Sequence, residues 1–344
     1  MKTFELDYDI PPELIAQTPI EPRDAARLLV LDRRGGALAH RRFRDVVEYL
    51  RRGDLLVFNE TRVLNARLQA VKIPTGGRVE VLLLKRLDAT TWEGLAGGSG
   101  VRVGSRLRIL PAVEGASRDV TADVIAEFER GGRVLRFDRP IDDQLDVLGS
   151  MPLPPYIRQP LKDSERYQTI FARLPGSVAA PTAGLHFTPG LVQTLREHGV
   201  EMAFVELRVS LDTFRPILEE EVEQHRIHTE YCRVSTETVE QIERARRAGG
   251  RVIAVGTTAV RTLETAACGD ERVLEYAGDT RLFITPGYVF RVVDAMITNF
   301  HLPRSTLLAL VAAFVGLEQV LAAYRVAIAE RYRFYSFGDA MLIL

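Results

Sequence analysis

Cysteine and lysine are scarce in this chain of 344 residues. Its two cysteines, Cys232 and Cys268, exclude a disulfide scaffold and a zinc site made of four cysteine ligands. They fit a reducing compartment, and the N-terminus lacks the apolar core of a signal peptide, so we expect a cytoplasmic protein. Only four of the 45 basic residues are lysine. The arginines are bidentate phosphate binders, although genome composition alone explains such a bias.

Net charge and long apolar runs are also lacking. The formal net charge is -1, so any nucleic-acid partner must be met by a local basic patch. The longest apolar run, Leu307 to Val315, is too short to cross a bilayer, and we expect no membrane association. A hydrophobic fraction of 46% excludes disorder and predicts a large core in one or two domains.

Motifs of three common chemistries are missing. The run from Gly97 to Gly100 has no P-loop lysine, no glycine-rich dinucleotide fingerprint follows a strand, and no serine or cysteine elbow is apparent. His225 and His228 have His-x-x-His spacing, but without an HExxH pattern or a further ligand cluster. We therefore expect no metal, and interpret the pair as substrate contacts or as a satisfied surface pair.

The composition of the segments changes twice along the chain. Short β-type runs separated by glycine turns occupy residues 63–151, which predicts a small barrel or sandwich. Helical and strand patterns alternate after the proline cluster MPLPPYI. We predict an α/β fold, in which a mixed-sheet α/β domain (1–62 and 152–344) is interrupted by an inserted small β-barrel domain (63–151).

An arginine-rich segment lies near the N-terminus. Apolar residues at positions 43, 46, 47 and 50 predict a helix over residues 43–52. Seven arginines lie in or near it: Arg33, Arg34, Arg41, Arg42, Arg44, Arg51 and Arg52. They form either a solvated face or a patch that contacts phosphates.

The segment GSVAAPTAGLHFT, Gly176 to Thr188, is the most unusual in the chain. Its small residues let a ligand approach the backbone closely, and the helix that follows offers free amides to a polar group. His186 within it is suited to act as acid, base or hydrogen-bond donor. The alternative is a tight structural loop with His186 satisfied in the core.

The run VIAVGTTAVRTLE predicts a buried strand, a turn and a helix. Gly256, Thr257 and Thr258 fall at the carboxyl end of the strand, where α/β sheets bind ligands. Arg261 lies one helical turn further on. An ordinary strand-to-helix cap is the alternative.

Two more polar positions lie near the C-terminus. Asn299 and His301 precede an apolar helix in ITNFHLPRSTLLALV, and both residue types suit hydrogen bonding to a heterocycle. Asp339 precedes the apolar C-terminal residues, which predict a buried strand. Asp339 is either a cap or a carboxylate that takes part in the chemistry.

Together these segments resemble the S-adenosylmethionine:tRNA ribosyltransferase-isomerase family of queuosine biosynthesis. The resemblance runs through nearly the whole chain. Its blocks are RDAARLLVLDR, GDLLVFNETRVLNARL, GSVAAPTAGLHFT, HRIHTEYCRV, VIAVGTTAVRTLE, PGYVFRVVDAMITNFHLPRSTLLALV and YRFYSFGDAMLI. One block departs from the family pattern. The family has LHVGxGTF at this place, whereas this chain has LRVSLDTF. Arg208 stands in place of the histidine, and Ser210 and Asp212 stand in place of glycines. Asn65 also replaces a proline, and Phe337 a tyrosine.

The resemblance implies a substrate, a donor and a fold. The ribosyl moiety of S-adenosylmethionine, a co-substrate, is transferred and isomerised onto 7-aminomethyl-7-deazaguanine at the wobble position of a tRNA with a GUN anticodon. Epoxyqueuosine-tRNA, adenine and methionine are the products. No metal takes part, and we expect a monomer. The family fold is similarly an α/β domain with an inserted β-barrel.

The implied reaction requires placed acids and bases, because a proton leaves the carbon beside the sulfonium and adenine departs. We expect His186, His228 and Asp339 to be the catalytic residues. The expected substrate-binding residues are Asn59, Thr61, Arg62, Thr182, Gly184, Thr257, Thr258, Arg261, Asn299 and His301. Threonines and Gly184 would shape the donor pocket, Asn299 and His301 would hold a base edge, and the arginines would hold phosphate or carboxylate.

Three rival functions predict different sequence features or a different response to a chelator. An RNA methyltransferase would carry a glycine-rich donor loop after its first strand, which this chain lacks. A non-catalytic RNA-binding module would not need a loop such as PTAGLHF. A metal hydrolase would use His225 and His228 and would lose activity with a chelator.

Overall fold

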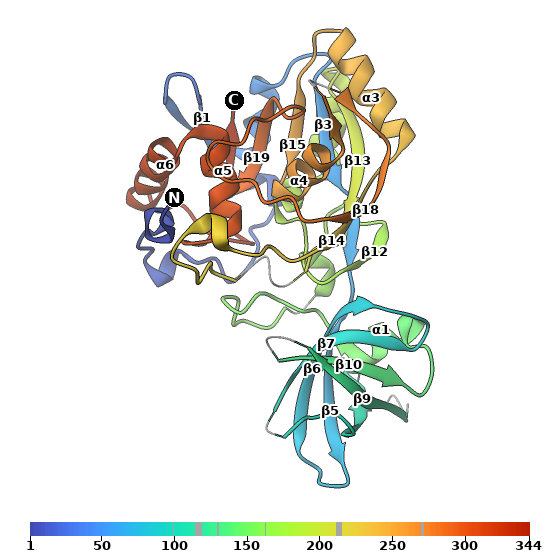
Figure 1. Cartoon of the computed structure of the whole chain (residues 1–344). Coiled ribbons are helices and arrows are strands. Elements are labelled where there is room, and N and C mark those ends of the chain that lie inside the picture. The colour runs from blue at the N-terminus through green and yellow to red at the C-terminus, as the bar shows by residue number, and fades with distance from the viewer. Residues whose placement is uncertain (99, 114–118, 129–130, 162, 211–214, 270–271) are drawn as a thin grey trace. The chain divides into compact units, whose positions relative to one another are not determined.

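The computed structural model describes residues 1–98, 100–113, 119–128, 131–161, 163–210, 215–269 and 272–344 (Figure 1). These residues form two compact units. The α/β unit comprises Met1–Arg62, Pro155–Leu174 and Ala180–Leu344, and the barrel unit comprises Val63–Pro154 and Pro175–Ala179. The substituted LRVSLDTF block lies only in part within the described residues, since 211–214, with Asp212, fall outside them.

A mixed sheet of nine strands, counted over the described residues, forms the centre of the α/β unit. Its strands are β1 (Arg27–Leu31), β2 (Leu38–Arg42), β3 (Leu55–Asn59), β13 (Glu201–Leu207), β14 (Glu230–Val234), β15 (Val252–Val255), β18 (Tyr276–Thr280), β19 (Ala295–Asn299) and β20 (Ala340–Ile343). Their order is β18-β14-β13-β3-β15-β19-β20-β1-β2. Because β13, β3, β15 and β19 are mutually parallel, their carboxyl ends meet at one edge of the sheet.

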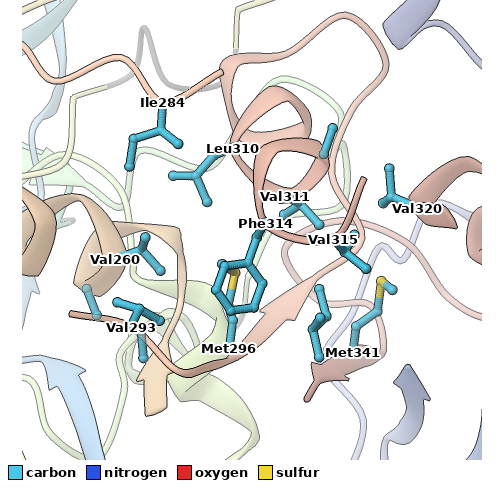
Figure 2. Packing of buried hydrophobic residues seen from close by; sticks show 14 of the residues in the cluster. Val260, Ile284, Val293, Met296, Leu310, Val311, Phe314, Val315, Val320 and Met341 are labelled. Atoms are coloured by element: carbon cyan, nitrogen blue, oxygen red, sulfur yellow. The ribbon is translucent and has the colours of Figure 1, made fainter. Parts of the chain in front are cut away.

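Helices cover both faces of this sheet, because alternate strand residues point to opposite sides. The helices are α2 (Pro189–Glu197), α3 (Thr236–Arg247), α4 (Thr257–Thr265), α5 (Thr306–Val315) and α6 (Leu317–Ala329), with the 3-10 helices η4 (Phe43–Tyr49) and η8 (Thr182–His186). Leu55 and Val57 of β3 pack in the cluster with α3 to α6, whereas Leu56 and Phe58 pack with α2, η4 and η8. Figure 2 shows part of the first cluster, with side chains from α4, α5, β19 and β20 in one group.

Local signals explain where several helices begin and end. The Thr188 hydroxyl accepts the Leu191 amide at 3.2 Å, which caps α2, and Ser305 caps α5 in the same way. The helix predicted over residues 43–52 is of the 3-10 type and ends at Tyr49. In a 3-10 helix residues three apart share a face, which is how Phe43 and Val46 are both buried.

Among the described residues, no single helix is long and apolar enough to span a membrane. Helices α5 and α6 reach that length and apolar character only when they are taken together, and they are bent by 111° at the break between them.

The barrel unit is a closed antiparallel barrel. Its six strands are β5 (Arg67–Ile73), β6 (Arg78–Arg86), β7 (Thr91–Gly97), β8 (Arg106–Leu110), β9 (Val120–Phe128) and β10 (Gly132–Phe137). The order β5-β6-β7-β10-β9-β8 is closed by pairing of β8 with β5. Leu107 and Ile109 of β8 point inward and its arginines outward, as a period of two requires. The predicted α/β fold with an inserted small barrel is confirmed.

The remaining elements are short. They are β4 (Thr61–Val63), α1 (Leu145–Leu148), β11 (Gly149–Ser150), β12 (Leu174–Ser177), β16 (Ala267–Cys268) and β17 (Arg272–Val273).

Candidate active site

A pocket of about 40 Å³ lies in the α/β unit at the carboxyl edge of the parallel strands. We call it the donor pocket. Its walls are the loops that follow β15 and β19, part of η8, and a segment near the C-terminus. Five of the predicted binding residues line it: Thr182, Thr257, Thr258, Asn299 and His301. Three of them converge because β15 and β19, the strands that end just before Thr257 and Thr258 and at Asn299, run parallel and end at the same edge of the sheet.

The turn after β15 allows a ligand to approach closely. Gly256 has a φ of 91°, a conformation that residues with a side chain rarely adopt. Thr258 begins the next helix, and its buried hydroxyl has no hydrogen-bond partner among the described residues. Because an unpaired buried hydroxyl is costly, the Thr258 oxygen indicates a position that a ligand atom completes.

Asn299 connects three segments around the donor pocket. Its Oδ1 accepts from the Thr182 hydroxyl at 2.9 Å, and its Nδ2 donates to the Tyr335 carbonyl at 3.2 Å. The same Nδ2 lies 3.4 Å from His186 Nε2. The amide thus orients the His186 ring and favours the tautomer with its proton on Nδ1.

Two buried histidines are neutral at pH 7. Burial lowers the pKa of His186 to about 4, although a hydrogen bond from the ring to the Arg23 backbone opposes this, and burial lowers the pKa of His301 to about 3. The His186 ring stacks on Phe43, with 4.8 Å between ring centroids. His301 Nε2 lies 2.7 Å from the Thr298 hydroxyl. Because each ring is neutral, one of its two nitrogens carries no proton and can accept one directly.

Glu230 and Arg261 form a buried ion pair at the start of β14. Glu230 Oε1 also lies 3.0 Å from His228 Nε2 and accepts the Ser210 amide at 2.8 Å. Burial raises the pKa of Glu230, but Arg261 and His228 outweigh it and lower the value to about 2. Arg261 Nε donates to the Leu282 carbonyl at 3.2 Å, while its Nη2 has no partner among the described residues.

The family model for the queuosine biosynthesis protein matches residues 3–343. The chain belongs to this family. It is similar to the S-adenosylmethionine:tRNA ribosyltransferase-isomerases of Moorella thermoacetica, at 52% identity over 347 residues, and Symbiobacterium thermophilum, at 52% over 346, each alignment covering 100% of both chains. It is also similar to the crystal structure of the Thermotoga maritima S-adenosylmethionine tRNA ribosyltransferase, at 42% identity and a TM-score of 0.57, over 99% of this chain and 100% of that one. The resemblance drawn from the motifs is confirmed, and the protein is an enzyme of this transferase-isomerase family.

In this family member, some predicted binding residues hold the protein together instead of lining the donor pocket. Asn59 Nδ2 donates to the Leu207 carbonyl at 3.0 Å and its Oδ1 accepts the Leu207 amide at 3.1 Å, which joins β3 to β13. The Thr61 hydroxyl donates to the Leu174 carbonyl at 3.3 Å. Arg62 pairs with Glu165 at the surface.

Gly184 and Asp339 also have structural contacts. A Cβ at Gly184 would lie 3.0 Å from Thr169 Cγ2, so a larger residue there would crowd the Thr169 side chain that packs against η8. The two carboxylate oxygens of Asp339 accept the amides of Arg27 at 2.8 Å and Arg333 at 2.7 Å, and burial raises its pKa. Asp339 thereby anchors backbone and is not among the residues that line the donor pocket.

The sequence patterns did not single out three residues of the pocket wall: Tyr156, Tyr335 and Ser336. The Tyr156 hydroxyl lies 2.8 Å from Ser336 Oγ, and the two tyrosine rings are 4.9 Å apart between centroids. Tyr335 and Ser336 lie in the aromatic C-terminal segment, and Tyr156 lies in the proline cluster MPLPPYI. Their meeting across 180 positions of chain has no local signature.

The His-x-x-His pair forms two separate contacts. His225 Nδ1 lies 2.8 Å from Glu219, whereas His228 contacts Glu230. Over the described part of the chain, no group of three or more His, Cys, Asp or Glu side chains is placed to hold a metal ion. Burial raises the pKa of Cys232 to about 12, so this thiol is no thiolate nucleophile at neutral pH.

Of the divergent LRVSLDTF block, three described residues lie close to these sites. Arg208 pairs with Glu206 at 2.8 Å and its guanidinium lies 4.5 Å from the Tyr231 ring centroid. Val209 lines the donor pocket, and Ser210 donates its amide to Glu230. Since Ser210 acts through its backbone amide, its side chain is not required for this contact.

Proposed function

We propose that this enzyme transfers and isomerises the ribosyl moiety of S-adenosylmethionine onto 7-aminomethyl-7-deazaguanine at the wobble position of a tRNA with a GUN anticodon. Epoxyqueuosine-tRNA, adenine and methionine are the products. The observation that supports this most directly is the unpartnered Thr258 hydroxyl in a pocket that also gathers Thr182, Asn299 and His301. The names of the relatives agree with the same class of donor and acceptor.

The donor pocket has groups suited to a nucleoside bearing a sulfonium. Hydroxyls of Thr257 and Thr258 suit the polar edge of the nucleoside, and the Tyr156 and Tyr335 rings offer aromatic faces to a cation. Bound S-adenosylmethionine supplies the ribosyl group and an acidified ribose carbon. Arg261 lies behind the pocket wall, one helical turn beyond Thr257 and Thr258, and we assign its Nη2 to the methionine carboxylate because a guanidinium binds a carboxylate strongly and this nitrogen is unpartnered among the described residues.

Proton transfer is assigned to histidines. His186, oriented by Asn299, and His301 are neutral and can accept a proton, while Glu230 orients His228. A positioned acid or base contributes on the order of 10²–10⁴ to the rate. We leave Asp339 out of the catalytic set because both its oxygens hold backbone amides.

Labelled donor tests the reaction itself. The enzyme is incubated with ribose-labelled S-adenosylmethionine and a tRNA carrying 7-aminomethyl-7-deazaguanine. We expect label in the tRNA and release of adenine and methionine in equal amounts. Methyl transfer with S-adenosylhomocysteine as product would support a methyltransferase instead, and loss of turnover with a chelator would support a metal enzyme.

Replacing Thr258 with valine should separate activity from stability. If the hydroxyl bonds only to substrate, its loss should lower kcat/KM about tenfold, since a hydrogen bond is worth about 0.5–1.5 kcal/mol. The free energy of unfolding should be unchanged, because no protein partner among the described residues is lost. Steady-state kinetics and urea unfolding measure both.

Thr262→Val on the same helix is the matched control. The Thr262 hydroxyl donates to the Thr258 carbonyl at 2.9 Å, so its loss should cost about 1 kcal/mol of stability with kcat/KM nearly unchanged. Wild-type kinetics for Thr258→Val would contradict a role in substrate binding.

A further inference from the structure

A second and wider hollow, of about 650 Å³, lies over the ends of β14 and β18. Its walls are formed by Glu223, residues 225–229, Arg281, Phe283 and Thr285. We call it the arginine basin, after Arg226 and Arg281. Because β14 runs antiparallel to both β13 and β18, the carboxyl end of β18 lies at the same edge of the sheet as that of β13. The basin and the donor pocket therefore open along one edge of the α/β unit.

Within the described part of the chain, the two arginines of the basin are exposed cations without acidic partners. Arg226 forms no ion pair with any residue that the structure describes. Arg281 is held by a hydrogen bond from its Nε to the Thr229 hydroxyl at 2.7 Å, which leaves its outer nitrogens unused by any described carboxylate. Guanidinium groups in this state suit phosphate oxygens.

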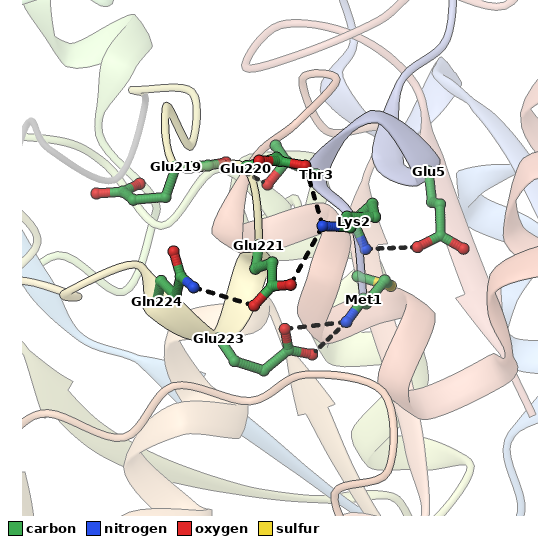
Figure 3. Close-up of polar contacts among 9 residues, drawn as sticks. All are labelled: Met1, Lys2, Thr3, Glu5, Glu219, Glu220, Glu221, Glu223 and Gln224. Carbon is green, nitrogen blue, oxygen red and sulfur yellow. Dashed lines mark hydrogen bonds and ion pairs between the residues drawn. The ribbon is translucent and has the colours of Figure 1, made fainter.

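An acidic segment next to the basin is partly neutralised by the N-terminus (Figure 3). Lys2 Nζ lies 3.0 Å from Glu220 and 3.2 Å from Glu221, and the amino group of Met1 lies 2.9 Å from Glu223. Without these contacts the carboxylates would repel a polyanion. With them, two of the three negative charges are balanced, which weakens the repulsion of a polyanion beside Arg226 and Arg281.

Aromatic groups line the same hollow. The rings of His225 and Phe283 lie 5.8 Å apart between centroids, in an edge-to-face arrangement. Both rings are only partly buried. Partly exposed rings beside arginines are the combination on which single-stranded nucleic acids stack their bases.

Glu230 links the basin to the donor pocket. Its carboxylate contacts His228 in the basin wall and Arg261 on α4, the helix whose first residues line the donor pocket. Strands β14 and β15 are separated by three strand spacings, or about 14 Å. A few nucleotides of single strand cover that distance.

We infer that the arginine basin holds the sugar-phosphate backbone of nucleotides adjacent to the wobble position, with Arg226 and Arg281 on phosphates. This inference rests on the proposed function, which binds S-adenosylmethionine in the donor pocket and so requires the wobble base to reach that pocket. A flanking base stacks on Phe283, and the wobble base alone enters the deeper site. The basin thus selects a splayed single-stranded loop over a duplex.

The test is the salt dependence of tRNA binding to the full-length enzyme. The probe is an unmodified tRNA transcript with a GUN anticodon, and the variants are Arg226→Ala, Arg281→Ala and the double variant. Each lost phosphate contact should reduce the slope of log K against log salt by about 1, and by about 2 in the double variant. The KM for S-adenosylmethionine should not change.

Arg247→Ala is the matched control. Arg247 ends α3 at the opposite edge of the sheet and is exposed, so the same loss of charge there should leave the slope unaltered. An unchanged slope in the double variant, an equal loss in Arg247→Ala, or a raised KM for S-adenosylmethionine would overturn the basin assignment. Wild-type enzyme that binds tRNA with the expected slope but transfers no ribose label would overturn the proposed function alone.

Discussion

Glu230→Gln is expected to lower the free energy of unfolding by about 3–5 kcal/mol, because it leaves the buried Arg261 guanidinium without its counter-charge. Both side chains are almost fully buried, so water cannot replace the lost partner. The substitution keeps the volume of the side chain and thus tests charge and not packing. Urea unfolding followed by circular dichroism measures the change.

Two variants make this expectation specific. Glu243→Gln breaks an exposed pair with Arg247 and should cost less than about 1 kcal/mol. Replacing Glu230 and Arg261 together, by leucine and methionine, removes both charges and should recover most of the lost stability. A loss below about 1 kcal/mol for Glu230→Gln would show that the pair is screened by solvent in solution.

Stability should also fall steeply when the pH is lowered below 6.5. The folded pKa values of His186, about 4, and His301, about 3, lie below the ordinary value of 6.5, so the unfolded chain binds protons first. Each histidine then contributes a loss of about 1.4 kcal/mol per pH unit, or about 5 kcal/mol for both between pH 6.5 and 4.5. Glu230, with a folded pKa of about 2, adds a further loss only below 4.5.

Denaturant midpoints measured from pH 7.5 to 4.5 test this slope. His186→Gln and His301→Gln should each remove about half of it, because each eliminates one group that the unfolded state protonates first. The stability contribution of both histidines is present above pH 6.5 and lost towards acid. A flat profile between pH 6.5 and 5 would mean that the rings are hydrated in solution.

Features that depend on neighbours in the chain could be predicted. Thr188 and Pro189 start α2, and the strand, turn and helix around Gly256 lie within a residue or two of their expected places. The type of the helix at Phe43 could not be predicted, because apolar spacing does not distinguish a short 3-10 helix from an α-helix.

The site residues also divide into those that neighbouring residues predict and those that depend on distant contacts. Thr182, Thr257, Thr258, Asn299 and His301 were predicted because each follows a strand or begins a helix, and such positions face the carboxyl edge of a parallel sheet. Asp339 was assigned to catalysis on chemistry alone, yet its partner Arg27 lies 312 positions away. Whether a carboxylate faces a pocket or a backbone amide depends on such distant contacts.

The amino-acid sequence by itself determined the order of the elements, the small residues of the loops and the family. Only the tertiary structure decided that Tyr156 and Tyr335 meet at the donor pocket, that Glu230 pairs with Arg261, and that Arg226 and Arg281 share a basin. The physical reason is that turns and caps result from short-range sterics and hydrogen bonds, whereas burial and charge pairing arise when segments far apart in the chain pack together.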